Sequence, residues 1–105
     1  TLRMVAQYAD ACNIGDWVGK ENMQKALDTL KEHCHSLGRD YDTVEKTCLG
    51  TVHLSGDDTV DSILSRIKEL SGMGFTHAIF NMPDVYTITP LETFAKEIIP
   101  FAARL

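Results

Sequence analysis

The chain has 105 residues, of which 44% are hydrophobic and 24% charged, a composition typical of one globular domain. A formal net charge of −5 disfavours nucleic acid and an anionic membrane surface as main partners. No apolar run approaches the roughly 18 residues of a membrane-spanning helix, so no membrane segment is predicted.

The first third of the chain predicts a helix, a strand and a second helix. Apolar residues recur at helical spacing over residues 2–9, and a short strand-like stretch, residues 10–14, follows directly. After a glycine-containing loop, apolar residues spaced by three and four predict a long helix over residues 21–37. Gly38 stands where a helix C-terminus takes a positive φ, so we expect the helix to end there.

The middle of the chain predicts a strand and a helix. Residues 45–54 are rich in Thr, Val and Leu and contain no proline, which favours a strand. Gly50 within this strand indicates close packing or a bulge. Helical periodicity then runs over residues 59–71, and Gly72 and Gly74 are expected to end that helix.

The last third of the chain predicts a strand and a helix that contains a proline. Residues 76–82 form a continuous apolar run, which is typical of a strand buried on both faces. Thr89 is expected to cap the final helix, with Pro90 at its first position and Glu92 completing a capping box. Pro100 lies inside this helix and should kink or shorten it.

The order of these elements indicates the fold class. Strands and helices alternate strictly, and each strand–helix–strand unit is long enough for a right-handed parallel crossover. We therefore predict one α/β domain over residues 1–105, with about three parallel strands alternating with helices. A piece of a doubly wound sheet and a piece of a (β/α)₈ barrel both fit this pattern.

The cysteines favour a reducing compartment. Cys12, Cys34 and Cys48 are odd in number and form no CxxC pair, so we expect free thiols and a cytoplasmic location. Cys34 lies between His33 and His35, but consecutive helical residues point about 100° apart and cannot converge on one ion. Cys34 is therefore interpreted as a buried core residue.

Five segments resemble, in the same order, the C-terminal half of the bacterial luciferase-like monooxygenases. They are residues 1–13, 30–40, 44–47, 74–80 and the closing 91–100. The ordered set is similar above all to the subgroup that includes deazaflavin-dependent oxidoreductases. This resemblance implies a partial TIM barrel, in which residues 1–105 are the C-terminal fragment of a (β/α)₈ domain about three times as long.

The resemblance also implies a chemistry. Members of this family transfer hydride, or activate oxygen, with FMN or a deazaflavin coenzyme and act on a small-molecule substrate. The glycine-rich loop that holds the cofactor phosphate precedes the segment that matches the start of this chain. We therefore expect the fragment alone to be inactive and to bind no cofactor, and we assign no catalytic residue and no metal ligand.

Active sites of barrel enzymes lie at the C-terminal ends of the strands, which here directs attention to three positions. These are Asn13 with Asp16 and Trp17, His53 with Ser55, and Asn81 with Asp84. In the complete barrel His53 would contact cofactor, substrate or a proton in transfer, and the two asparagines would hydrogen-bond a ring or polar group. The structural alternative is that the asparagines cap turns and that the polar groups of His53 hydrogen-bond to residues near it at the strand end.

Three other features have structural interpretations. Trp17 is expected to cover the end of the barrel rather than to stack on a ligand. His77 should lie at the N-terminal end of its strand, away from chemistry. Asp57 and Asp58 are better explained by the start of a helix than by a metal.

Three strands that form only part of a barrel would leave the inner face of their sheet exposed and the outer edges of the first and last strands unpaired. Several hundred Å² of exposed apolar surface would forgo on the order of 10 kcal/mol, so we expect a homo-oligomer. The alternative to a barrel fragment is a self-standing α/β module that binds a ligand or partner at its strand ends without catalysis.

Overall fold

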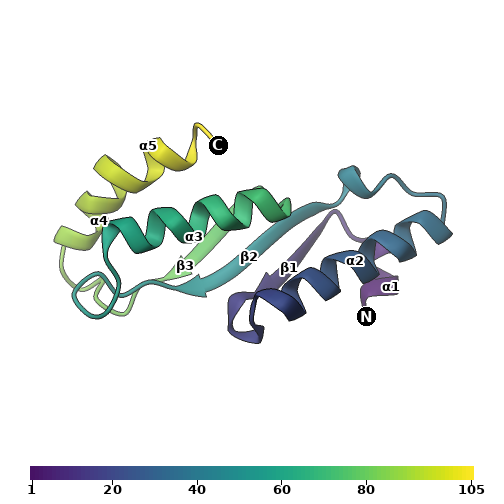
Figure 1. Ribbon diagram of the computed structural model, residues 1–105, viewed down its shortest axis with the longest axis horizontal. Helices are drawn as coiled ribbons and strands as arrows, with labels where there is room; N and C mark the ends of the chain where they lie inside the picture. The colour runs from purple at the N-terminus through teal and green to yellow at the C-terminus, as the bar shows by residue number, and fades with distance from the viewer.

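The computed structural model describes residues 1–105 and consists of three parallel strands that alternate with helices along the chain (Figure 1). The strands are β1 (Ala11–Gly15), β2 (Glu45–Thr51) and β3 (His77–Asn81), and they lie side by side in chain order. The predicted parallel alternation is therefore confirmed. The sheet extends along a molecule that measures 46 × 25 × 21 Å.

The N-terminal half packs two helices against β1 and β2. α1 (Leu2–Tyr8) lies against α2 (Lys20–Ser36), and a 3₁₀ turn, η1 (Asp16–Val18), joins β1 to α2. Gly38 follows the helix end with a φ of 71°, as predicted. The larger of two core clusters forms here, and its members are Ala6, Cys12, Ile14, Met23, Leu27, Leu30, Cys34, Val44, Cys48, Leu70 and Phe75.

The central strand is shorter than predicted. After the 3₁₀ turn η2 (Tyr41–Thr43), β2 ends at Thr51 rather than at residue 54. The backbone N–H of Val52 still donates to the Asn81 carbonyl, at 2.9 Å. Beyond it the chain turns, because the His53 carbonyl accepts the N–H groups of Gly56 and Asp58.

α3 (Val60–Met73) is capped at both ends by its own sequence. The Thr59 hydroxyl accepts from the Ser62 N–H at 3.1 Å, and the Ser62 hydroxyl accepts from the Thr59 N–H at 2.9 Å. This reciprocal capping box satisfies two backbone donors that a helix start leaves free. Gly74, with a φ of 104°, ends the helix, whereas Gly72 lies inside it and ends nothing, contrary to prediction.

The prediction that β3 is buried on both faces is wrong. His77, Ala78 and Ile79 are exposed, and Ile79 retains 42% of its accessible surface. β3 has a strand neighbour on one side only, and helices cover one face of the sheet only. An apolar run of this kind is buried on both faces only where other elements cover both sides of the strand, and the run itself does not show which elements those are.

The C-terminal helix is irregular. It consists of α4 (Thr89–Thr93), a π-helical segment η3 (Phe94–Ile98) and α5 (Ile99–Ala102). Proline has no N–H and its ring conflicts with the carbonyl four residues earlier in a regular α-helix. The wider π turn directly before Pro100 relieves this conflict, so the predicted disturbance of the helix is confirmed.

The predicted cap at Thr89 is wrong. Thr89 is already inside the helix, Ile88 is the N-cap residue, and no side chain caps this end. The Glu92 N–H donates to the Ile88 carbonyl at 3.0 Å and so is not free for the Thr89 hydroxyl. A preceding turn, in which Thr87 bonds back to Asp84, leads the backbone directly into the helix one residue early.

The helices leave one face of the sheet uncovered. Cys12, Ile14 and Cys48 point into the core under α2 and α3, while the alternating positions between them point away. A second cluster lies between β2, α3 and the C-terminal helix, and its buried members are Val52, Ile63, Ile67 and Ile98. No helix combines the length and the apolar character needed to cross a lipid bilayer.

Candidate functional site

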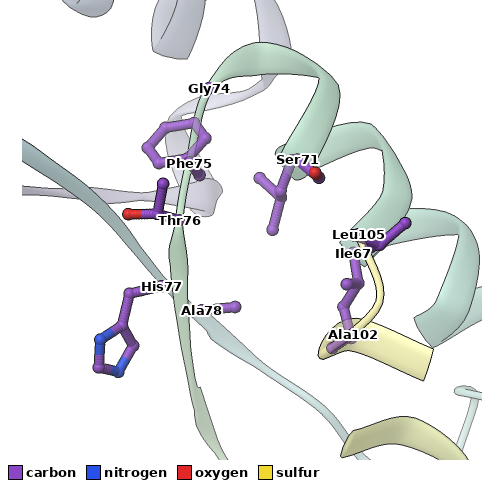
Figure 2. Close-up of a pocket in the computed structure, with 10 residues that line it drawn as sticks. Ile67, Ser71, Gly74, Phe75, Thr76, His77, Ala78, Ala102 and Leu105 are labelled. Carbon is purple, nitrogen blue, oxygen red and sulfur yellow. The ribbon is translucent and has the colours of Figure 1, made fainter. Parts of the chain in front are cut away.

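The uncovered side of the sheet, here named the open face, carries the predicted site residues Asn13 and Asn81. Its positions follow from strand alternation and register: Ala11, Asn13 and Gly15 on β1, Glu45, Thr47, Leu49 and Thr51 on β2, and His77, Ile79 and Asn81 on β3. Figure 2 shows the two sides at β3, where Ala78 points toward α3 and His77 points away from it. The open face therefore has polar rows at both ends and an apolar row, Leu49 with Ile79, between them.

Asn13 lies in the middle of β1 rather than at its end. Its Oδ1 accepts a hydrogen bond from the Thr47 hydroxyl at 2.7 Å, across the register pair that the two residues form. Thr47 is buried, and this bond is the shorter of two that its hydroxyl makes, since the Cys12 carbonyl lies 3.5 Å from the same oxygen. The interpretation of Asn13 as a turn cap is wrong, and its Nδ2 donors have no partner within the chain.

Trp17 does not cover a core, because 72% of its surface is exposed. Its indole lies over Gly15, on the open-face side, where a Cβ added to Gly15 would overlap the six-membered part of the ring. Glycine is therefore needed at position 15 because a side chain there would collide with the ring. Its backbone dihedral angles do not require glycine. The expectation that Trp17 covers the barrel end is not met within this chain.

His53 lies two residues beyond β2, and its backbone is held by an aspartate. Asp58 Oδ2 accepts the His53 N–H at 2.8 Å, which fixes the loop over residues 53–58. The imidazole rests against Gly56, where an added Cβ would overlap it. Asp58 thus supports the loop and does not form a metal pair with Asp57, and no group of three or more His, Cys, Asp or Glu side chains converges anywhere in the chain.

Asn81 is the last residue of β3, opposite Thr51. Its carbonyl accepts from Val52, while its side chain is exposed and makes no hydrogen bond within the chain. Asn13 pairs with Thr47 and Asn81 with Thr51, four residues apart along β2, which separates the two rows by about 13 Å. The structure thus brings His53 and Asn81 to one end of the sheet and leaves Asn13 in its middle.

Ser55 and Asp84, both predicted at the strand ends, contact each other directly. Asp84 Oδ2 accepts from the Ser55 N–H at 3.0 Å and from its hydroxyl at 2.9 Å, which ties the loop after β2 to the loop after β3. Burial of the carboxyl acts to raise its pKa, but these hydrogen bonds and nearby His53 outweigh it and hold the pKa of Asp84 below its ordinary value. The other oxygen, Oδ1, is buried without a partner.

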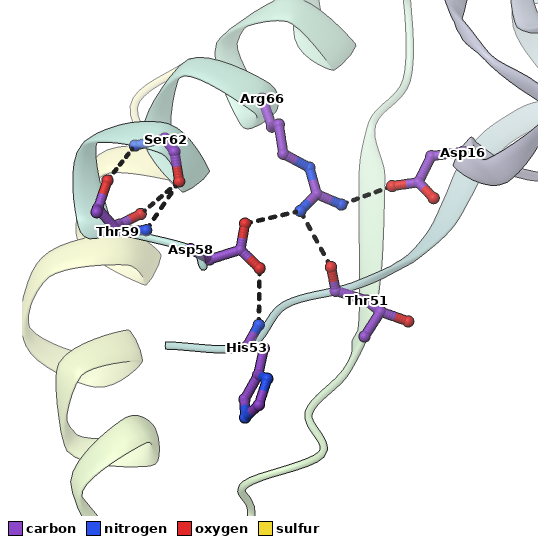
Figure 3. A network of polar contacts seen from close by, with 7 residues as sticks. All are labelled: Asp16, Thr51, His53, Asp58, Thr59, Ser62 and Arg66. Atoms are coloured by element: carbon purple, nitrogen blue, oxygen red, sulfur yellow. Dashed lines mark hydrogen bonds and ion pairs between the residues drawn. The ribbon is translucent and has the colours of Figure 1, made fainter. Parts of the chain in front are cut away.

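Sequence reasoning missed Arg66, which contacts residues at the ends of all three strands; Figure 3 shows its contacts with Asp16, Thr51 and Asp58. Its guanidinium pairs with Asp16 at 2.5 Å, donates to the Thr51 carbonyl at 3.0 Å and lies 5.3 Å from the centre of the Phe80 ring. Asp58 lies 3.8 Å away on the other side. The only signal was Gly50, whose predicted close packing is confirmed because an added Cβ would overlap Asp16 and Arg66.

A cavity with several apolar residues in its wall lies away from the predicted rim. It has a volume of about 270 Å³ and lies between α3, the start of β3 and the C-terminus, with Ile67, Phe75 and Leu105 in its wall (Figure 2). It opens on the helix side, at the N-terminal end of β3. His53, Ser55, Asn81 and Asp84 lie at the opposite end of the strands, so this cavity is separate from the predicted site residues.

Comparisons of the chain with family models, curated proteins and solved structures found no match.

Proposed function

We propose that this chain is the C-terminal portion of a (β/α)₈ barrel related to the luciferase-like, flavin- or deazaflavin-dependent monooxygenases and oxidoreductases. The observation that carries the barrel is the one-sided cover of a parallel sheet whose strands follow in chain order. In a doubly wound sheet helices cover both faces, whereas in a barrel they form an outer ring and the other face points inward. The chemistry rests on the sequence resemblance.

The open face suits the ring of a flavin better than its phosphate. Asn13 offers free Nδ2 donors in the middle of the sheet, and the Asn81 amide is exposed at the strand ends, so each of them offers hydrogen bonds to a polar ring edge at its own row. No lysine or arginine occupies the open face, where Glu45 and His77 are the only titratable side chains. A phosphate would therefore be bound by another part of the complete barrel.

A bound flavin would supply the hydride transfer or oxygen activation, and the residues described here would orient it. In this proposal the Asp58 and Asp84 carboxylates hold the loops that carry His53 and Ser55 at the rim. His53 is placed to contact cofactor or substrate or to pass a proton. The chain alone lacks most of a pocket and is proposed to have no turnover.

The gene upstream of Thr1 gives the most direct test. We expect an in-frame segment that encodes the first strands of the barrel and a glycine-rich loop. The full reading frame should bind FMN or a deazaflavin coenzyme and reduce or oxidise it, whereas residues 1–105 should bind only weakly. A frame that begins close to Thr1, or tight flavin binding by residues 1–105, would contradict the proposal and favour a self-standing ligand-binding module.

We also propose that residues 1–105 self-associate when they are produced alone. The outer edges of β1 and β3 are unpaired, and Leu49 and Ile79 lie uncovered on the open face. Pairing these edges or faces between two copies would remove both from water. Light scattering at micromolar concentration should show a dimer or larger species, and a clean monomer would exclude this.

The proposed location is the cytoplasm. All three cysteines are buried free thiols within one core cluster, which suits a compartment that keeps thiols reduced.

A further inference from the structure

We propose that Gly15 and Trp17 form a stacking platform for a planar heteroaromatic ring. The identification of that ring as a flavin rests on the proposed function, whereas the platform rests on the geometry of the open face. Trp17 is the chain's single tryptophan, and it is among its most exposed large apolar side chains. What distinguishes it from the exposed Tyr8 and Tyr86 is that its ring lies against the glycine of a strand, on the open face.

The seat is built from the backbone of β1. A glycine stands at the position where the indole crosses the strand, and any side chain there would collide with the ring. One face of the indole is therefore held against the end of β1, and most of the ring remains open to solvent. A ring that is fixed on one side and open on the other can stack a ligand with little loss of side-chain entropy.

The surroundings of the platform select the class of ligand. Asn13 lies on the same face, two residues before Gly15, and its Oδ1 is already occupied by Thr47. The free groups of Asn13 are therefore donors, which favour a ring with a carbonyl oxygen or ring nitrogen on its edge. Leu49, opposite Gly15, and Ile79 beyond it continue the platform as apolar surface.

The open face carries no group that would recognise a phosphate. No lysine or arginine occupies it, and Asp16, which is next to Trp17 in the chain, is paired with Arg66. Any binding of a phosphorylated ring compound at this position must therefore come from the ring itself.

The test uses FMN as the probe and ribitol 5-phosphate, which lacks the ring, as its control. The indole N–H of the single tryptophan gives one assignable NMR signal, and quenching of FMN fluorescence gives a second readout that does not need Trp17. FMN should shift the indole signal of the wild-type chain, and ribitol 5-phosphate should not. No shift with FMN, or an equal shift with both compounds, overturns the proposal.

Two glycine variants separate the platform from general effects of added methyl groups. Gly15→Ala displaces the indole from its seat and should weaken FMN binding several-fold. Gly72→Ala is the matched control, because an added Cβ there meets nothing within 4 Å, and it should bind as the wild type does. Equal binding by both variants overturns the proposal.

Substitutions of the ring itself provide a test that does not depend on strain in the sheet. Trp17→Leu should weaken FMN binding about tenfold, because leucine cannot stack on a planar ring, and Trp17→Phe should retain part of the binding. Trp17→Leu with wild-type binding overturns the platform whatever the upstream gene encodes. Ring-dependent binding in a chain whose reading frame starts near Thr1 would instead retain the platform and refute the barrel proposal.

Discussion

Gly50→Ala should destabilise the protein through the ion pair that lies beneath that glycine. A Cβ at position 50 would overlap the Asp16 carboxylate and approach Arg66 Nη2 to 2.8 Å. Both side chains are more than two-thirds buried, and each is held by the other at 2.5 Å. The added methyl group must therefore displace the pair rather than fill empty space.

The size of the effect follows from one stabilising contribution and two destabilising contributions to the free energy of unfolding. Replacing glycine by alanine in a strand interior normally stabilises by about 0.5–1 kcal/mol. Overpacking a closed site costs about 1–3 kcal/mol, and disturbing a hydrogen bond between charged groups costs about 1.5–3 kcal/mol. We expect a net loss of about 2 kcal/mol in the free energy of unfolding, or a fall of about 1 M in the urea midpoint.

A double-mutant cycle with Asp16→Ala tests the reasoning. With the carboxylate removed, the nearest remaining group to the new methyl is the Arg66 guanidinium, which is the end of a long, flexible side chain. Gly50→Ala should then change stability by less than about 0.5 kcal/mol, which leaves a coupling energy of about 2 kcal/mol. Urea unfolding followed by far-ultraviolet circular dichroism is the suitable assay, because Trp17 adjoins Asp16 and its fluorescence would report the substitution itself.

The refuting result is an equal cost of Gly50→Ala in both backgrounds. Equal costs would mean that the methyl group strains the sheet rather than the ion pair. Unequal m-values among the four proteins would show that the unfolding reaction itself had changed, and the cycle would then be repeated by thermal unfolding.

The remaining predictions concern a carboxylate, a core residue and a helix cap. Because the pKa of Asp84 is lowered in the folded state, its carboxylate stabilises the fold above the ordinary aspartate pKa and this stability is lost as the pH falls through the lower value. Asp84→Asn should flatten that acid dependence in urea unfolding at a series of pH values, and an unchanged profile would contradict it. Leu30 is completely buried, so Leu30→Ala should cost about 2–5 kcal/mol in urea unfolding, and a loss below 1 kcal/mol would be inconsistent with the core described. Thr59→Ala should cost about 1 kcal/mol in the same assay while Thr89→Ala costs little, because only Thr59 caps a helix; the reverse order would restore the original sequence prediction.

The positions of the helices and strands could be predicted from the sequence because they depend on local patterns. The spacing of apolar residues in α2 and α3, the glycine at position 38 and the proline at position 100 each act within a few residues. The parallel arrangement also followed, since strands joined by helices can scarcely pair in another way. Asn81 was correctly placed at the end of its strand, whereas Asn13 lies in the middle of β1 rather than at its end.

Other features depended on contacts between segments far apart in the chain. The exposure of β3 depends on which strands flank it, and the role of Asp84 depends on Ser55, which lies 29 residues earlier. Thr59 caps α3, whereas Thr89, which has the same type of side chain, lies inside α4 because the turn from Asp84 to Thr87 precedes it.

The sequence by itself therefore determined one α/β unit with three parallel strands and the residues available at their ends. Only the tertiary structure decided how those residues combine. It seats Trp17 on Gly15, joins the strand ends through Arg66 and leaves one face of the sheet open. The physical reason is that helical and strand periodicity are local, whereas register, burial and side-chain pairing arise only when distant segments meet.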